Sequence, residues 1–153
     1  MITLTAARAA TGLGLLIAAL AGPFAEAQIV CLTVDSEASK ANFEAIAGDK
    51  LALAFTHSIY GTQVEEHFRI GAGAFQLFQL RYEELRLVEF YGHESARREN
   101  GWWVVDQVGR ELAALDLRAS QDASMRVTFR NREISLGGRA RLSVNACARE
   151  IHG

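Results

Sequence analysis

The chain has 153 residues, of which 50% are apolar and 22% are charged, and its formal net charge is −2. This length is typical of one domain, and this composition excludes a disordered chain and a strongly basic nucleic-acid-binding protein. With a single proline, the sequence is also unlike proline-rich and collagen-like scaffolds.

The N-terminal segment, residues 1–27, differs from the remainder of the chain. It has an arginine near its start, an apolar run over 12–22 and the tripeptide AEA at 25–27, the small-x-small pattern that signal peptidases accept. The apolar run is shorter than the roughly 20 residues that a membrane-spanning helix needs. The sequence therefore predicts a signal peptide over 1–27 and a single exported, periplasmic domain over 28–153. The alternative is that the leader is not cleaved and attaches the protein to the membrane.

The two cysteines, Cys31 and Cys147, lie near the two ends of the predicted mature domain. In an oxidising compartment an even number of cysteines is most simply explained by a disulfide, which would join the first strand to the last. The alternative is two separately buried thiols. The pair lacks the CxxC spacing of zinc and thioredoxin-like sites.

The mature chain is predicted to consist of short strands separated by glycine and polar turns. Residues 50–57 and 62–70 alternate in side-chain character, and the sequence IYG between them predicts a hairpin. The other strands are expected at 29–34, 75–82, 85–91, 102–105, 112–117, 125–129, 133–136 and 141–144.

Two segments also fit a helix. Residues 36–47 have a capping residue at Asp35 or Ser36 and a stop at Gly48, and an amphipathic helix across 74–91 fits the periodicity there. The overall pattern, about eight or nine short strands at this spacing, predicts an all-β domain. We expect either an antiparallel β-sandwich or a partly open barrel.

The predicted hairpin breaks its own pattern at two positions. Glu66 lies on the apolar face of its strand, between Val64 and Phe68, and His57 lies on the apolar face of the preceding strand. Residues on the same face of adjacent antiparallel strands are cross-strand or diagonal neighbours, so we expect His57 and Glu66 to meet at the edge of the core. A buried carboxylate needs a partner, and a histidine can neutralise it.

Three interpretations of this pair remain open. It is a structural cluster that fixes the hairpin register with hydroxyl groups from Ser58 and Thr62, or the floor of a ligand pocket, or the acid/base pair of a small hydrolase or isomerase. Ser58 directly follows His57, and neighbouring residues of a strand point to opposite faces, which disfavours a serine nucleophile. A metal site needs three or four convergent ligands, and because His67 faces away from Glu66, we expect neither a metal nor a cofactor from the available donors, His57, Glu66, His67 and His93.

A second candidate region is the segment FYGHESARRENGWW at residues 90–103. Tyr91 and His93 flank a glycine, and Trp102 and Trp103 follow a loop that contains two arginines. On a strand, one tryptophan would point inward and the other outward. An outward tryptophan beside a tyrosine or an arginine is typical of a surface that binds a partner or a small organic anion. The alternative is one tryptophan in the core and one that covers a loop.

The segment THSIYGTQVEEHFRI, followed at a distance by GWWVV, resembles the bacterial family of domain of unknown function 1850. Many members carry a Gly-Ala-Gly segment after the strand that follows the hairpin, whereas this chain has ELRLVEFYGHE. The resemblance rests on a Cys-Leu opening at 31–32, a His-Ser motif, a threonine and paired glutamates, here His57, Ser58, Thr62, Glu65 and Glu66.

Members of this family commonly accompany the permease of TRAP-type transporters, or are fused to it. The periplasmic receptor of these transporters is of the TAXI class. The resemblance implies a binding accessory of such an uptake system, in contact with the permease, the receptor or its solute. It implies no reaction, and a purely structural interaction domain is the remaining alternative. The candidate binding residues are His57, Ser58, Thr62, Glu66, Tyr91, His93, Trp102 and Trp103.

Overall fold

The computed structural model of the protein describes residues 27–147. Apart from its last residue, the predicted signal peptide lies outside the described residues. No helix within the described part is long and apolar enough to cross a membrane. The elements in chain order are β1 (Ile29–Ser36), β2 (Lys40–Ile46), β3 (Lys50–Thr56), β4 (Gln63–Ile70), β5 (Phe75–Tyr82), α1 (Leu85–Phe90), β6 (Arg97–Glu99), β7 (Trp102–Leu112), β8 (Ala114–Ala119), a 3-10 turn (Gln121–Ala123), β9 (Arg126–Phe129), β10 (Arg132–Ser135) and β11 (Gly138–Asn145).

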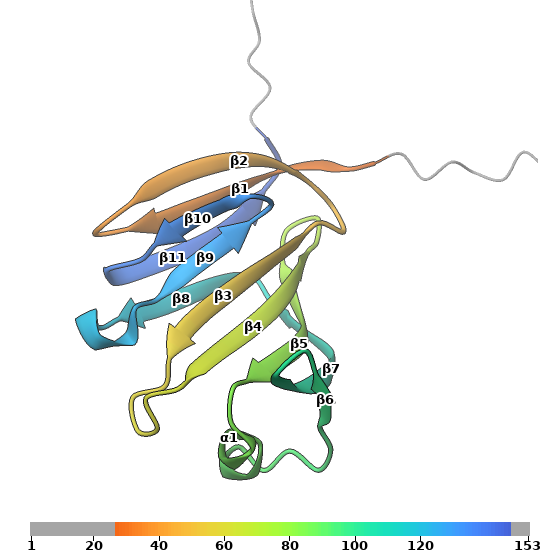
Figure 1. Cartoon of the computed structure of the whole chain (residues 1–153). Coiled ribbons are helices and arrows are strands. Elements are labelled where there is room, and N and C mark those ends of the chain that lie inside the picture. The colour runs from red at the N-terminus through yellow and green to blue at the C-terminus, as the bar shows by residue number, and fades with distance from the viewer. Residues whose placement is uncertain (1–26, 148–153) are drawn as a thin grey trace, which may run out of the picture.

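The strands form two sheets (Figure 1). The small sheet has the strand order β2-β1-β11-β8, and the large sheet has the order β10-β9-β3-β4-β5-β7-β6. Neighbouring strands are antiparallel in both sheets, which pack as a sandwich and do not close into a barrel. The predicted antiparallel β-sandwich is thus confirmed, with eleven strands in residues 27–147 where about eight or nine were expected.

The main core lies between the two sheets. Strand β1 alternates in burial, and its inward side chains Val30, Leu32 and Val34 are completely buried. They belong to one cluster with Leu53 and Phe68 of the large sheet. Burying one side chain of this kind contributes about 1.5–3 kcal/mol, so this cluster is the main source of stability for the sandwich.

A second, smaller core lies under helix α1. Its two buried residues, Leu87 and Val88, pack against Val64 and Tyr82 of the large sheet. Phe55 of β3 borders both this cluster and the main core, so α1 and the small sheet cover the same face of the large sheet, which we call its inner face. Figure 1 shows α1 beyond the end of β5, away from the small sheet.

The disulfide between Cys31 and Cys147 is confirmed. It joins β1 to the residues that follow β11, with the two Cα atoms 4.9 Å apart. Strands β1 and β11 are already neighbours in the small sheet, where Cys31 is opposite Asn145. The covalent bond therefore fastens the last described strand to a central strand of its own sheet.

The helical interpretation of residues 36–47 is wrong. The hydroxyl group of Ser36 and the backbone of Ser39 bond each other in a tight turn, and β2 then runs back along β1 with Phe43 opposite Leu32. The alternative helix over 74–91 is right only for its last part, because Phe75–Tyr82 form strand β5 and helix α1 covers Leu85–Phe90, where the other expectation was a strand. Both Leu87 and Val88 are buried there, as adjacent residues of a short helix lying on a sheet can be.

Candidate functional site

The turn between β3 and β4 is built around His57. Its backbone N–H donates to the carbonyl of Thr62 and its carbonyl accepts from the N–H of Gly61, both at 2.8 Å. Gly61 has φ +64°, a conformation that favours glycine. The N–H of Tyr60 donates to Nδ1 of the His57 ring at 3.4 Å, and the ring is 7% exposed. The backbone and the buried imidazole of His57 therefore both form hydrogen bonds that stabilise the turn.

An aromatic cluster surrounds this histidine. The ring of His57 stacks on Tyr60 with centroids 5.4 Å apart and meets Phe90 and Tyr91 edge-on at 5.5 and 5.8 Å. Tyr91 also stacks on Tyr82 at 5.7 Å. We use the name aromatic cluster for the six residues His57, Tyr60, Tyr82, Phe90, Tyr91 and His93.

The end of α1 positions three members of the cluster. Phe90 is its last residue, Tyr91 is its C-cap, and Gly92 at φ +69° turns the chain back, with its N–H donating to the carbonyl of Glu89. His93 then returns over the sheet, where a ring nitrogen lies 2.8 Å from the hydroxyl oxygen of Tyr82. A short helix that is anchored by its buried side and ends in glycine thus presents aromatic side chains on its other side.

Part of the aromatic cluster is exposed to solvent. Phe90 is 50% exposed and Tyr91 is 47% exposed, although both are large apolar side chains. Ile59 in the β3–β4 turn and Leu85 at the start of α1 are exposed as well. Four of the six exposed large hydrophobic residues in the described chain therefore lie on this turn and this helix. Such a concentration, unlike scattered single residues, is typical of an interaction site.

Glu66 lies on the inner face of the large sheet, opposite Leu53 on one side and Leu80 on the other. Burial raises the pKa of the Glu66 carboxyl, and the positive charge of Arg110 acts in the opposite direction. Burial also raises the pKa of Tyr82 and of Tyr91, and the negative charge of Glu66 adds to both shifts. Glu66 therefore lies close enough to the aromatic cluster to act on its hydroxyl groups electrostatically.

The expected contact between His57 and Glu66 is not formed. In the hairpin register, Glu66 is opposite Leu53 and Gln63 is opposite Thr56, so His57 lies beyond the paired region. Four residues of strand, about 13 Å, separate His57 from the position opposite Glu66. Among the described residues, neither a hydrogen bond nor an ion pair links the two side chains. The acid/base interpretation therefore lacks the geometry on which it was based.

The other candidate residues are the two tryptophans of β7 and two hydroxyl residues of the β3–β4 turn. Trp103 is opposite Tyr82 and packs in the second core, with the guanidinium of Arg98 5.2 Å from its ring, whereas Trp102 lies on the other face of the sheet. Ser58 is exposed in the turn, and Oγ1 of Thr62 is buried without a hydrogen-bond partner among residues 27–147. No set of three or more potential metal ligands was found within the described chain.

Sequence reasoning missed three members of the aromatic cluster, Tyr60, Tyr82 and Phe90. Tyr60 belongs to the IYG turn and Phe90 directly precedes Tyr91, so both were close to candidates in the sequence. Only the sheet order β3-β4-β5-β7 brings the turn, the helix and β5 to one end of the molecule. His57 of the first candidate region and Tyr91 and His93 of the second therefore meet in the aromatic cluster.

The neighbouring glutamates Glu65 and Glu66 are expected to respond oppositely to pH. Glu65 lies on the outer face, with its carboxylate 2.9 Å from the ring of His67, and this hydrogen bond lowers the pKa of Glu65. Its stabilising contribution is present above the ordinary pKa of 4.5 and is lost as the pH falls through the lowered value. For Glu66 the raised pKa means that the folded protein loses stability as the pH rises from 4.5 through the raised value.

We therefore expect Glu65→Gln to destabilise the protein most at neutral pH and Glu66→Gln to destabilise it least, or to stabilise it, in the same range. The measurement is the free energy of unfolding from urea titrations over a pH series, with each variant serving as the control for the other. If the two differences from wild type change in the same direction with pH, the assigned environments of the two carboxyl groups are wrong.

A protein-family model described as "Domain of unknown function (DUF1850)" matches residues 51–136, which is more than half of the chain. The matched part begins in β3 and ends just after β10, so it contains the whole aromatic cluster and Glu66. No curated protein and no solved structure matches the chain.

Proposed function

We propose a function from the premise that this chain belongs to the DUF1850 family of domains of unknown function. The proposed function is that of a binding accessory of a TRAP-type solute uptake system, acting in the periplasm. In this proposal, the exposed part of the aromatic cluster docks on the periplasmic side of the permease. The observation that carries it is the concentration of exposed apolar side chains, with Ile59 68% and Phe90 50% exposed.

The chemistry of this surface suits protein binding. Interfaces are enriched in aromatic residues and arginine, and a few well-packed anchors carry most of the binding energy. Here the guanidinium of Arg86 lies 5.1 Å from the ring of Tyr60, so arginine borders the aromatic rings. Tyr91 stacks on Tyr82, and Phe90 meets Tyr91 edge-on at the end of the helix. Because both rings are held in this way, little side-chain freedom is lost when a partner covers them.

The permease is the partner that we favour over the receptor or the solute. The resemblance implies that related domains accompany the permease or are fused to it, and a fused domain stays beside the permease at all times. A surface of exposed rings and aliphatic side chains matches a protein partner better than a small polar solute. The disulfide between Cys31 and Cys147 supports an oxidising location, where such bonds persist.

Deletion of the gene for this protein is expected to reduce uptake of the solute of the partner system severalfold, because the permease loses its accessory. Uptake of a radiolabelled solute by the deletion strain measures this directly, and a plasmid copy of the gene should restore it. Uptake through an unrelated transporter in the same strain is the control. Wild-type uptake rates in the deletion strain would count against a transport role and favour a purely structural domain.

A further inference from the structure

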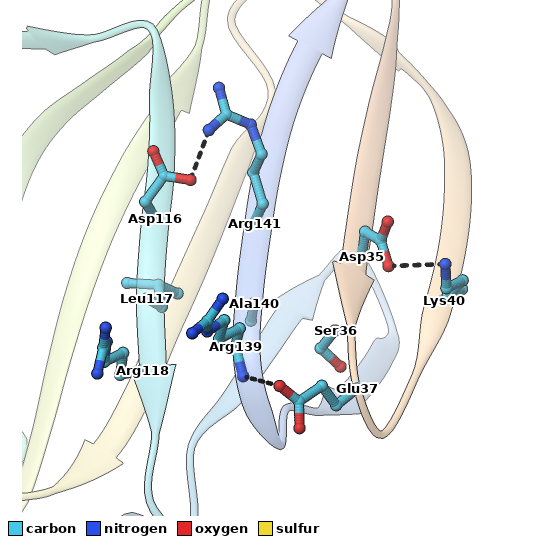
Figure 2. Close-up of a pocket in the computed structure, with 10 residues that line it drawn as sticks. All are labelled: Asp35, Ser36, Glu37, Lys40, Asp116, Leu117, Arg118, Arg139, Ala140 and Arg141. Carbon is cyan, nitrogen blue, oxygen red and sulfur yellow. Dashed lines mark hydrogen bonds and ion pairs between the residues drawn. The ribbon is translucent and has the colours of Figure 1, made fainter.

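A groove crosses the outer face of the small sheet, on the side away from the main core. Its volume is about 630 Å³, within the range of small-molecule sites, and strands β1, β2, β8 and β11 contribute to it (Figure 2). Charged side chains of both signs line it, together with Leu117 and Ala140. None of these residues belongs to the aromatic cluster, so the groove is independent of the proposed docking surface.

The three carboxylates of the groove are already engaged. Asp35 forms an ion pair with Lys40 at 3.1 Å, and Asp116 forms one with Arg141 at 2.6 Å. The Glu37 carboxylate accepts a hydrogen bond from the backbone N–H of Arg139 at 3.1 Å. Figure 2 shows these three interactions as dashed lines.

Two cations of the groove are left without an anion. Arg118 of β8 and Arg139 of β11 are directly opposite each other in the small sheet. Within residues 27–147, the guanidinium groups of Arg118 and Arg139 take part in none of the ion pairs or side-chain hydrogen bonds. Like charges directly opposite on adjacent strands repel each other and destabilise a sheet, unless an anion lies between them.

We propose that this groove binds a small organic carboxylate, with Arg118 and Arg139 as its anion-binding residues. A guanidinium presents parallel N–H donors that match the two oxygens of a carboxylate, and two such groups on neighbouring strands can grip it from both sides. Leu117 itself packs toward the main core, so the apolar contact to the body of the ligand comes from the aliphatic stems of the two arginines. A smaller adjoining pocket shares both arginines and adds Ser120 as a further polar group.

The test uses the purified mature protein and three probes, which are benzoate, inorganic phosphate and the neutral analogue benzamide. Binding is followed by titration in two-dimensional NMR spectra, with shifts expected at residues 116–118 and 139–141. Benzoate should bind and benzamide should not, because only the former carries the charge. Arg118→Gln combined with Arg139→Gln should weaken benzoate binding about tenfold or more, as expected for lost charge-assisted hydrogen bonds.

The control variant is Arg130→Gln combined with Arg132→Gln, which removes the same charge from the large sheet and its β9–β10 turn and should leave benzoate binding unchanged. Phosphate binding as tight as benzoate binding would overturn the carboxylate assignment in favour of a general oxyanion site. Equal binding of benzamide, or equal loss in both double variants, would overturn the site itself. Urea titration of both variants verifies that each is folded.

Discussion

Reduction of the Cys31–Cys147 disulfide is expected to lower the free energy of unfolding by up to about 5 kcal/mol, the largest single effect that we predict. The bond closes a loop across a sequence separation of 116 residues, which covers almost all of the described chain. In the chain-entropy model, a bond that closes a longer loop restricts the unfolded chain more. Breaking that bond therefore stabilises the unfolded state more. For a domain of ordinary stability, this is a large fraction of the total.

The measurement is guanidinium unfolding of protein purified under oxidising conditions, with and without later addition of a reducing agent. A variant with Cys31→Ser and Cys147→Ser should match the reduced wild type and should not respond to the reducing agent. Identical unfolding midpoints for oxidised and reduced protein would show that the bond does not restrict the unfolded chain as expected.

The strands were predictable because they depend on local patterns, and the disulfide was predictable because two cysteines in an exported domain allow one pairing. The alternation in residues 50–57 and 62–70 is the two-residue period of a strand with one face buried, and the IYG sequence marks the turn between them. In the structure these features become β3, β4 and a bond between neighbouring parts of the small sheet.

The helix and strand β2 were not predictable in the same way. Segment 85–91 fits both a strand and part of a longer helix over 74–91, and it is helical because Leu87 and Val88 fill the space over the uncovered end of the large sheet. Residues 36–47 have helix-compatible ends, but pairing with β1 satisfies the backbone of β2 as an edge strand. In both cases tertiary packing overrides weak local preference.

The site was predictable in composition but not in arrangement. His57, Tyr91 and His93 were chosen as candidates from two separate segments, and they do meet in one aromatic cluster. The pairing of His57 with Glu66 failed because it required the turn to begin later than it does, and register depends on turn geometry. Alternation of apolar and polar residues shows on which face of the sheet a side chain lies, but it does not show which residue of the neighbouring strand is opposite.

The second large effect concerns the proposed docking surface. Replacing Phe90 and Tyr91 together by alanine is expected to weaken binding to the permease about 30-fold or more, equivalent to about 2 kcal/mol or more. Both side chains are about half exposed, so the domain should remain folded with a modest loss of the stacking on Tyr82. The matched control is Ile46→Ala combined with Phe78→Ala, which removes an exposed aliphatic and an aromatic side chain remote from the aromatic cluster.

The most direct measurement is the affinity of residues 28–153 for the purified permease of the proposed partner system, held in lipid nanodiscs. The wild type and the Ile46→Ala, Phe78→Ala control should bind equally, and the Phe90→Ala, Tyr91→Ala variant should bind far more weakly. No binding of the wild type to the permease, or equal binding by all three proteins, would contradict the account.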